Sequence, residues 1–157
     1  MASHSYYQLD VFSHRPGGGN PLGVVVGADD WSDAAMQAFA KWTDIVETTF
    51  LLRPTAAEAS YRLRIFMPDK EIAFAGHPSI GSAHVALLSG FAQARDGILI
   101  QECQAGLLPV RIEGEGDALA GQTDIELDVL GDIVARLEVG GDGSLVVGLG
   151  DAAEHVV

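Results

Sequence analysis

One segment of the sequence, PSIGSAHVALL at residues 78–88, is apolar or small on nearly every side of the helix that it predicts. Helices on protein surfaces carry a polar face, so a helix of this composition has to be covered all round. Strands that curl around the helix cover it better than a flat sheet on one side, because each exposed side needs a partner. The segment therefore predicts a helix enclosed by strands.

Strand-like segments stand before and after this helix. They alternate between apolar and polar residues or are rich in β-branched ones, and Gly-rich turns separate the later ones. We expect strands at residues 6–12, 23–26, 47–52, 61–67, 97–103, 107–113, 124–130, 133–139 and 144–148. The predicted fold class is α/β in the broad sense (α+β): a single domain with a mostly antiparallel sheet wrapped as a barrel around one central helix.

A second helix, of the surface type, is predicted at residues 32–42. Ser32 is its expected N-cap. The stripe that faces the core is expected to hold Met36, Phe39, Ala40 and, as a further candidate, Trp42. In the strand at 61–67, Arg62 and Arg64 alternate outward, which predicts that both are ordinary residues of the solvent face.

The length of 157 residues fits one globular domain, which we expect to cover residues 1–157. The sequence holds one cysteine, Cys103, so no intrachain disulfide can form and no cluster of soft metal ligands is available. We predict no metal, and a reducing compartment, the cytoplasm. The first residues do not read as a secretory leader, and no stretch reaches the roughly 18 apolar residues of a membrane span.

The net charge of −13 argues against nucleic acid and anionic membrane surfaces as partners, because phosphate binding needs a basic face. The charge is unevenly spread. Residues 1–112 hold 11 acidic and 8 basic side chains, whereas residues 113–157 hold 11 acidic side chains and one arginine. We interpret the acidic excess of the last third as a solvated surface that keeps the protein soluble.

The start of the apolar helix is a candidate anion site. Pro78 is expected at the first helical position, where its missing N–H costs nothing, so the free N–H groups of the first turn point at whatever precedes them. A carboxylate or a developing enolate oxygen would be stabilised there, and Gly76 and Gly81 would let a ligand approach the backbone. The alternative is that these residues only form a tight turn from the loop into the helix and bind no anion.

Glu47 is a candidate acid/base because it stands among Ile45, Val46 and Phe50. Partial desolvation in such surroundings favours the protonated carboxyl and raises its pKa toward a useful range. The alternative is a carboxylate at the rim that caps a turn. The spacing of the sequence does not place Glu47 near the helix start.

His77 is a candidate to hydrogen-bond a substrate or to shuttle a proton, since the pKa of histidine lies near neutrality. The other histidines show no spacing typical of metal ligands. Cys103 lies on a predicted strand, and a lone thiol there is interpreted as a packing residue rather than a nucleophile.

Several segments together resemble the PhzF family of phenazine biosynthesis isomerases in order and spacing. They are residues 10–12 (DVF), 19–21 (GNP), 47–50 (ETTF), 64–68 (RIFMP), 74–84 (FAGHPSIGSAH) and 101–107 (QECQAGL). The resemblance covers about residues 6–113 and corresponds to the N-terminal domain of that family.

The resemblance implies the diaminopimelate-epimerase-like fold, in which two similar domains each wrap a sheet around a helix and the active site lies between them. It also implies that Glu47 is the acid/base that moves a proton between carbons, with His77 in the same site. The substrate-binding residues that we expect are Asn20, Gly76, Ser79, Ile80 and Gly81. The type reaction of the family is isomerisation of trans-2,3-dihydro-3-hydroxyanthranilate.

The sequence departs from the family in length, because a member is nearly twice as long and its second domain brings a further Gly-rich motif and an aspartate to the cleft. No such motif stands here. Residues 114–157 are acidic and Gly-rich and resemble terminal strands that complete a domain, as if the second domain had been lost and its flanks rejoined.

Two functions from different classes remain open. The first is a cofactor-independent isomerase that acts on a small carboxylated, cyclic or unsaturated metabolite, with the site formed between two chains of a homodimer. The second is a protein that binds such a small anionic metabolite without turning it over, since fold and ancestry do not license activity. Retention of Glu47 favours the enzyme, because a pure binder has no evident need of it. A third possibility is that the chain is a truncated fragment of a longer protein and exposes an apolar face that is prone to association.

Overall fold

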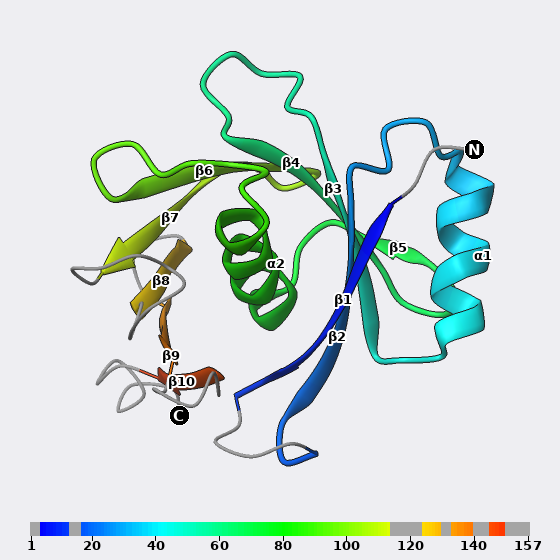
Figure 1. Ribbon diagram of the computed structural model, residues 1–157, viewed down its shortest axis with the longest axis horizontal. Helices are drawn as coiled ribbons and strands as arrows, with labels where there is room; N and C mark the ends of the chain where they lie inside the picture. Colours follow the sequence, from blue (N-terminus) through cyan, green and yellow to red (C-terminus); the bar gives the residue numbers. More distant parts are fainter. Residues whose placement is uncertain (1–3, 13–16, 114–123, 130–132, 140–144, 150–157) are drawn as a thin grey trace.

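The computed structural model (Figure 1) describes residues 4–12, 17–113, 124–129, 133–139 and 145–149. Within these residues, ten strands form one sheet in the order β1-β2-β3-β4-β6-β7-β8-β9-β10, with β5 beside β4. The strands are β1 (Ser5–Val11), β2 (Asn20–Val26), β3 (Glu47–Leu52), β4 (Tyr61–Phe66), β5 (Glu71–Ile72), β6 (Ile98–Cys103), β7 (Gly106–Glu113), β8 (Asp124–Val129), β9 (Ile133–Val139) and β10 (Leu145–Leu149).

Every predicted strand is present to within a few residues, and the short β5 is the one that the sequence did not predict. The predicted ends at Leu130 and Ser144 lie outside the described residues. Neighbouring strands are antiparallel, as expected, except the parallel pairs β2–β3 and β4–β6. The sheet curls without closing: β1 and β10 come near each other, but the described strands form no ladder between them. The barrel of the prediction is therefore an open curl.

Helix α2 (Gly76–Leu88) lies inside this curl, with strands on several sides of it (Figure 1). Most of its side chains are buried, which confirms the prediction drawn from residues 78–88. Its N-cap is Ala75, which offers no side-chain cap, and Pro78 is the third helical residue rather than the first. The prediction of Pro78 at the first position was wrong by two residues, because the N–H groups of the whole first turn lack intrahelical partners and proline is tolerated at any of them.

Helix α1 (Asp33–Thr43) lies on the other face of the sheet, outside the curl (Figure 1). The hydroxyl of Ser32 accepts a hydrogen bond from the amide of Ala35 at 3.2 Å, so the predicted N-cap is confirmed. Met36 and Ala40 are buried, whereas Trp42 is 78% exposed. The prediction for Trp42 was wrong because it follows Met36 by six residues, which turns it to the far side of a helix with 3.6 residues per turn.

Strand β3 is buried along its whole length because the two helices cover its two faces. Leu51 belongs to the apolar cluster around α2, and Phe50 belongs to the cluster beneath α1. Successive side chains of a strand point to opposite faces, so Glu47, Thr49 and Leu51 share the α2 side. The alternation of β3 therefore directs the carboxyl of Glu47 toward the central helix.

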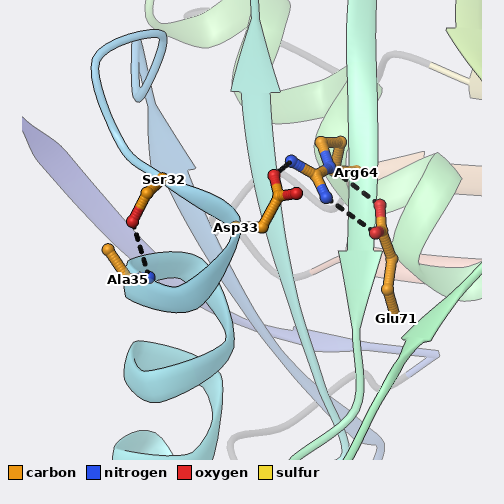
Figure 2. A network of polar contacts seen from close by, with 5 residues as sticks. All are labelled: Ser32, Asp33, Ala35, Arg64 and Glu71. Carbon is orange, nitrogen blue, oxygen red and sulfur yellow. Dashed lines mark hydrogen bonds and ion pairs between the residues drawn. The ribbon is translucent and has the colours of Figure 1, made fainter.

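Arg64 on β4 is not on the solvent face, and that prediction was wrong. Its guanidinium donates to Asp33 at 2.6 Å and to both oxygens of Glu71 at 2.7 and 2.8 Å (Figure 2). The hydrogen bonds to Glu71 are the largest cause that raises the pKa of Arg64 above its ordinary value. The side chain is covered because α1 and β5 both pack over this part of β4, which local alternation cannot reveal.

Candidate active site

Glu47 and His77 come together at one end of the curl. Glu47 is the first residue of β3 and pairs in register with Leu22 of β2, while His77 is the second residue of α2. The Nε2 atom of His77 lies 3.3 Å from the Oε2 atom of Glu47. The fold thus joins two candidates whose separation in sequence gave no reason to pair them.

These two atoms lie within ion-pair distance, yet neither makes a hydrogen bond to any residue that the structure describes. Both side chains are buried, with 11% of His77 and 12% of Glu47 exposed. Buried polar atoms in folded proteins nearly always have partners, so a pair without them needs an explanation. A site that is completed by a ligand or by another chain provides one.

Burial moves the two pKa values in opposite directions. It raises the pKa of the Glu47 carboxyl, and it lowers the pKa of the His77 imidazole, against the weaker effect of a hydrogen bond to the backbone of Pro21. Both shifts favour the uncharged forms. Burial therefore disfavours both a charged carboxylate and a charged imidazolium at this end of the curl.

The hydrogen bond to Pro21 also assigns a tautomer to that ring. Proline has only a carbonyl to offer, so the imidazole is the donor in this bond. Since Nε2 has no hydrogen-bond partner, the donor is Nδ1, and in the neutral ring Nε2 then carries the lone pair. In this tautomer the lone pair of His77 Nε2 is on the atom that lies 3.3 Å from Glu47 Oε2.

The tip of α2 is open next to this pair. Gly76 is exposed, and a Cβ built on it would meet nothing within 4 Å. The first backbone bond at this end runs from the amide of Ser79 to the carbonyl of Ala75, at 3.3 Å. The N–H groups of Gly76 and His77 precede that bond and have no partner inside the helix. They carry the partial positive charge of the helix start.

The other predicted binding residues divide into two groups. Asn20 is exposed at the start of β2, one residue before the proline that contacts His77. Ser79, Ile80 and Gly81 are buried inside the curl. A Cβ on Gly81 would meet the Cδ2 atom of Leu22 at 2.5 Å, so this glycine lets α2 approach β2 closely.

Two residues near the pair were missed by the sequence analysis. Phe12 follows β1 with a positive φ of 66°, and its ring centre lies 6.0 Å from that of His77. Pro21 contributes its carbonyl. Neither carries a local signal, because Phe12 looks like the last residue of a strand and every residue has a carbonyl.

Metal ligands do not gather anywhere in the described part of the chain, where no group of three His, Cys, Asp or Glu side chains is suitably placed. Cys103 is half-buried and lines a small cavity together with Arg64 and Glu71, on the other side of the sheet from Glu47. No helix of the described residues is long and apolar enough to cross a membrane.

Curated proteins similar to this chain include several isomerases. The chain is 49% identical over 117 residues to the Schizosaccharomyces pombe protein "Antisense-enhancing sequence 1", covering 74% of this chain and 40% of that protein. It is 38% identical over 110 residues to the trans-2,3-dihydro-3-hydroxyanthranilate isomerase of Pseudomonas aeruginosa, covering 70% of this chain and 38% of that enzyme. An uncharacterised isomerase of Pasteurella multocida is 36% identical, with 84% of this chain and 45% of that protein covered. The chain therefore spans less than half the length of these relatives.

Solved structures show the same fold. A Bacillus anthracis phenazine biosynthesis protein of the PhzF family superposes with a TM-score of 0.67 at 24% identity, covering 94% of this chain and 56% of that one. A predicted epimerase of Pseudomonas aeruginosa gives a TM-score of 0.62 at 33% identity, covering 79% and 43%. The family model described as phenazine biosynthesis-like protein matches residues 9–132. The chain belongs to this PhzC–PhzF family.

Proposed function

We propose that this chain is a PhzF-type isomerase, in which Glu47 and His77 transfer a proton between carbons of a small carboxylated metabolite without a cofactor. The observation that carries the proposal is the buried pair of atoms, Glu47 Oε2 and His77 Nε2, that lie 3.3 Å apart and lack hydrogen-bond partners among the described residues. Protein interiors tolerate such atoms where their chemistry is used.

The pair suits proton transfer because a proton between the two side chains has two nearby acceptors, Glu47 Oε2 and His77 Nε2, 3.3 Å apart. When that proton is on His77, Glu47 is a carboxylate and acts as the base for a proton on a substrate carbon. The C–H bond breaks, its electron pair passes to the substrate as an enolate, and the oxygen of that enolate accepts hydrogen bonds from the free N–H groups of the helix start. Return of the proton to another carbon completes the isomerisation and restores the pair.

The substrate class follows from the helix start and the relatives together. The N–H groups of Gly76 and His77 favour an anionic group, such as a carboxylate. The Pseudomonas aeruginosa relative is named for a cyclic, unsaturated carboxylate. We infer a substrate of this chemical type, used in the biosynthesis of phenazine-like secondary metabolites in the cytoplasm. In the proposed site, Gly76 and Asn20 contact the ligand, while Ser79, Ile80 and Gly81 shape the helix start from inside the curl.

The chain covers 38–45% of the three curated relatives named above, and we infer that a second half of the site is supplied by another chain. We propose that residues 1–157 form one domain, with the acidic residues 114–157 as its terminal strands, and that two such domains face each other as a symmetric homodimer. The pairs of the two chains would then enclose one cleft. Two facing carboxyls also separate their pKa values, which provides one acid and one base.

A second candidate function is binding without turnover. It is supported by the same partial coverage of the relatives, since the part that matches supplies one anion-binding helix start and one acid/base pair. In that case a carboxylated ligand would bind and dissociate unchanged.

The test measures the mass of the protein in solution and the exchange of carbon-bound hydrogen for deuterium in a panel of small cyclic and unsaturated carboxylates. We expect a dimer whose exchange activity falls about 10²- to 10⁴-fold in Glu47→Gln, the range that general acid/base groups contribute. The matched control is Glu71→Gln, which makes the same chemical change in the Arg64 cluster on the other face of the sheet.

Three outcomes separate the hypotheses. A monomer that binds a carboxylate but exchanges none of its hydrogens supports the binding protein and contradicts the enzyme. Equal exchange in the wild type and in Glu47→Gln removes Glu47 from the mechanism. Equal losses in Glu47→Gln and Glu71→Gln would show that folding, rather than chemistry, had been damaged.

A further inference from the structure

A chain of hydrogen bonds runs through the interior of the curl to the start of α2. The hydroxyl of Tyr61 on β4 donates to the side-chain oxygen of Gln101 on β6, at 3.2 Å. The amide nitrogen of Gln101 donates to the hydroxyl of Ser79 at 3.0 Å. That hydroxyl donates in turn to the carbonyl of Ala75, at 2.8 Å. This hydrogen-bond network thus ends at Ala75, the N-cap residue of α2.

All three side chains are completely buried, and they come from three different elements of the fold. Each donates to the next in one direction, so that every hydroxyl and the amide has a partner. Burial also raises the pKa of the Tyr61 phenol, so this hydroxyl keeps its proton. Buried networks that are fully satisfied hold the elements they join in one arrangement.

The element held in this case is the first turn of α2. Its N-cap, Ala75, has no side chain that can cap the free N–H groups, and the first residues carry no acidic group. The carbonyl of Ala75 is instead bound twice by Ser79, through its amide at 3.3 Å and its hydroxyl at 2.8 Å. His77 lies between Ala75 and Ser79, the two residues that these bonds join, and so belongs to the turn that the network holds.

We propose that Gln101, supported by Tyr61, is a positioning residue that fixes the first turn of α2 and thereby keeps His77 beside Glu47. Gln101 is buried, and among the described residues its hydrogen bond to Ser79 joins it to the helix start. The catalytic importance of this placement rests on the proposed function, but the placement itself does not. The inference therefore needs a test that requires no substrate.

The test follows the titration of the His77 ring by NMR, and the hydrogen exchange of the Ser79 amide, in the full chain. In Gln101→Leu we expect the His77 midpoint to rise toward that of free histidine, because a loosened first turn admits water to a ring whose pKa is lowered by burial. The Ser79 amide should exchange roughly fivefold to tenfold faster, as for the loss of one hydrogen bond. Near His77, the described residues that bear on its titration are Glu47, Phe12 and the carbonyl of Pro21.

The matched control is Ser82→Ala, which removes a buried hydrogen bond of 2.8 Å to Thr49 one turn further along the same helix. It should leave the His77 midpoint unchanged at a similar cost in stability. If Gln101→Leu does not fold, Tyr61→Phe removes the outer bond with little change in shape and should move both readouts in the same direction, by less.

The positioning role is overturned if the His77 midpoint is the same in wild type, Gln101→Leu and Tyr61→Phe, or if Ser82→Ala moves it equally. A protein without isomerase activity in which the midpoint moves as expected would reject the proposed function alone. A protein with Glu47-dependent exchange in which the midpoint stays fixed would reject the positioning role alone.

Discussion

Two acid–base clusters lie on opposite faces of the same sheet and use their charges differently. On the α1 side, Arg64 donates to Asp33 and Glu71, and both carboxylates are paired (Figure 2). On the α2 side, Glu47 and His77 meet with one atom of each left without a partner among the described residues. The first arrangement holds α1 and β5 to β4. We propose that the second serves the chemistry of the site instead, since its two facing atoms have no partners among the described residues.

The largest expected difference between the clusters is in activity. His77→Gln should reduce hydrogen exchange on the substrate about 10²-fold, because Glu47 loses the neighbouring base that accepts its proton. The matched control is His84→Gln, the same change at a half-buried position two turns further along α2. Equal losses of activity in the two variants would contradict a specific role for His77.

For the stability of the fold, we expect the Arg64 cluster to matter more than the pair of Glu47 and His77. Arg64→Met leaves the partly buried carboxylate of Glu71 without its donor, and we expect it to lower the free energy of unfolding by about 2 kcal/mol. This corresponds to a fall in Tm of roughly 4–8 °C. His77→Gln removes no hydrogen-bonded charge pair. A larger loss of stability in His77→Gln than in Arg64→Met would contradict the expectation that the Arg64 cluster contributes more to stability. Thermal unfolding followed by circular dichroism measures both.

The smallest expected effect is the dependence of stability on pH, which should have opposite signs in the two clusters. The hydrogen bond from Arg64 lowers the pKa of Asp33 below its ordinary 3.8, so its contribution is present above that pH and is lost as the pH falls. Burial raises the pKa of Glu47 above its ordinary 4.5, so its contribution is full below that pH and is lost as the pH rises through the folded value.

Urea unfolding of two variants across this pH range tests the signs. At neutral pH, Asp33→Asn should be less stable than wild type, and the difference should shrink in acid. Glu47→Gln should gain stability relative to wild type as the pH rises, since it lacks the carboxyl that is costly to ionise. The same sign in both variants would mean that one of the two carboxyls is not in the environment described.

Local patterns in the sequence predict most of this fold. Alternation locates the strands, the composition of residues 78–88 predicts the burial of α2, and Ser32 marks the start of α1. Patterns fail where a distant segment decides the outcome. Arg64 looks like a surface residue until α1 and β5 cover it, and Trp42 falls outside the core stripe only once the phase of the helix is known.

The candidate site is predicted less completely. Glu47 and the helix start are recognisable from the segments that resemble the family, and Glu47 also from its apolar neighbours. Their contact depends on the parallel pairing of β2 with β3 and on the depth of α2 in the curl, which no local pattern contains. The hydrogen-bond network from Tyr61 through Gln101 to Ser79 cannot be predicted from local patterns either, because its bonds join residues 40 and 22 positions apart.

The proposed site is tested most directly by the titration of the Glu47 carboxyl itself, followed by carbon-13 NMR in the wild-type chain. We expect a midpoint for Glu47 above the ordinary 4.5, together with a His77 midpoint below the ordinary 6.5. A Glu47 midpoint at or below 4.5 would mean that the carboxyl is solvated or paired, and it would contradict the claim that burial disfavours its charged form.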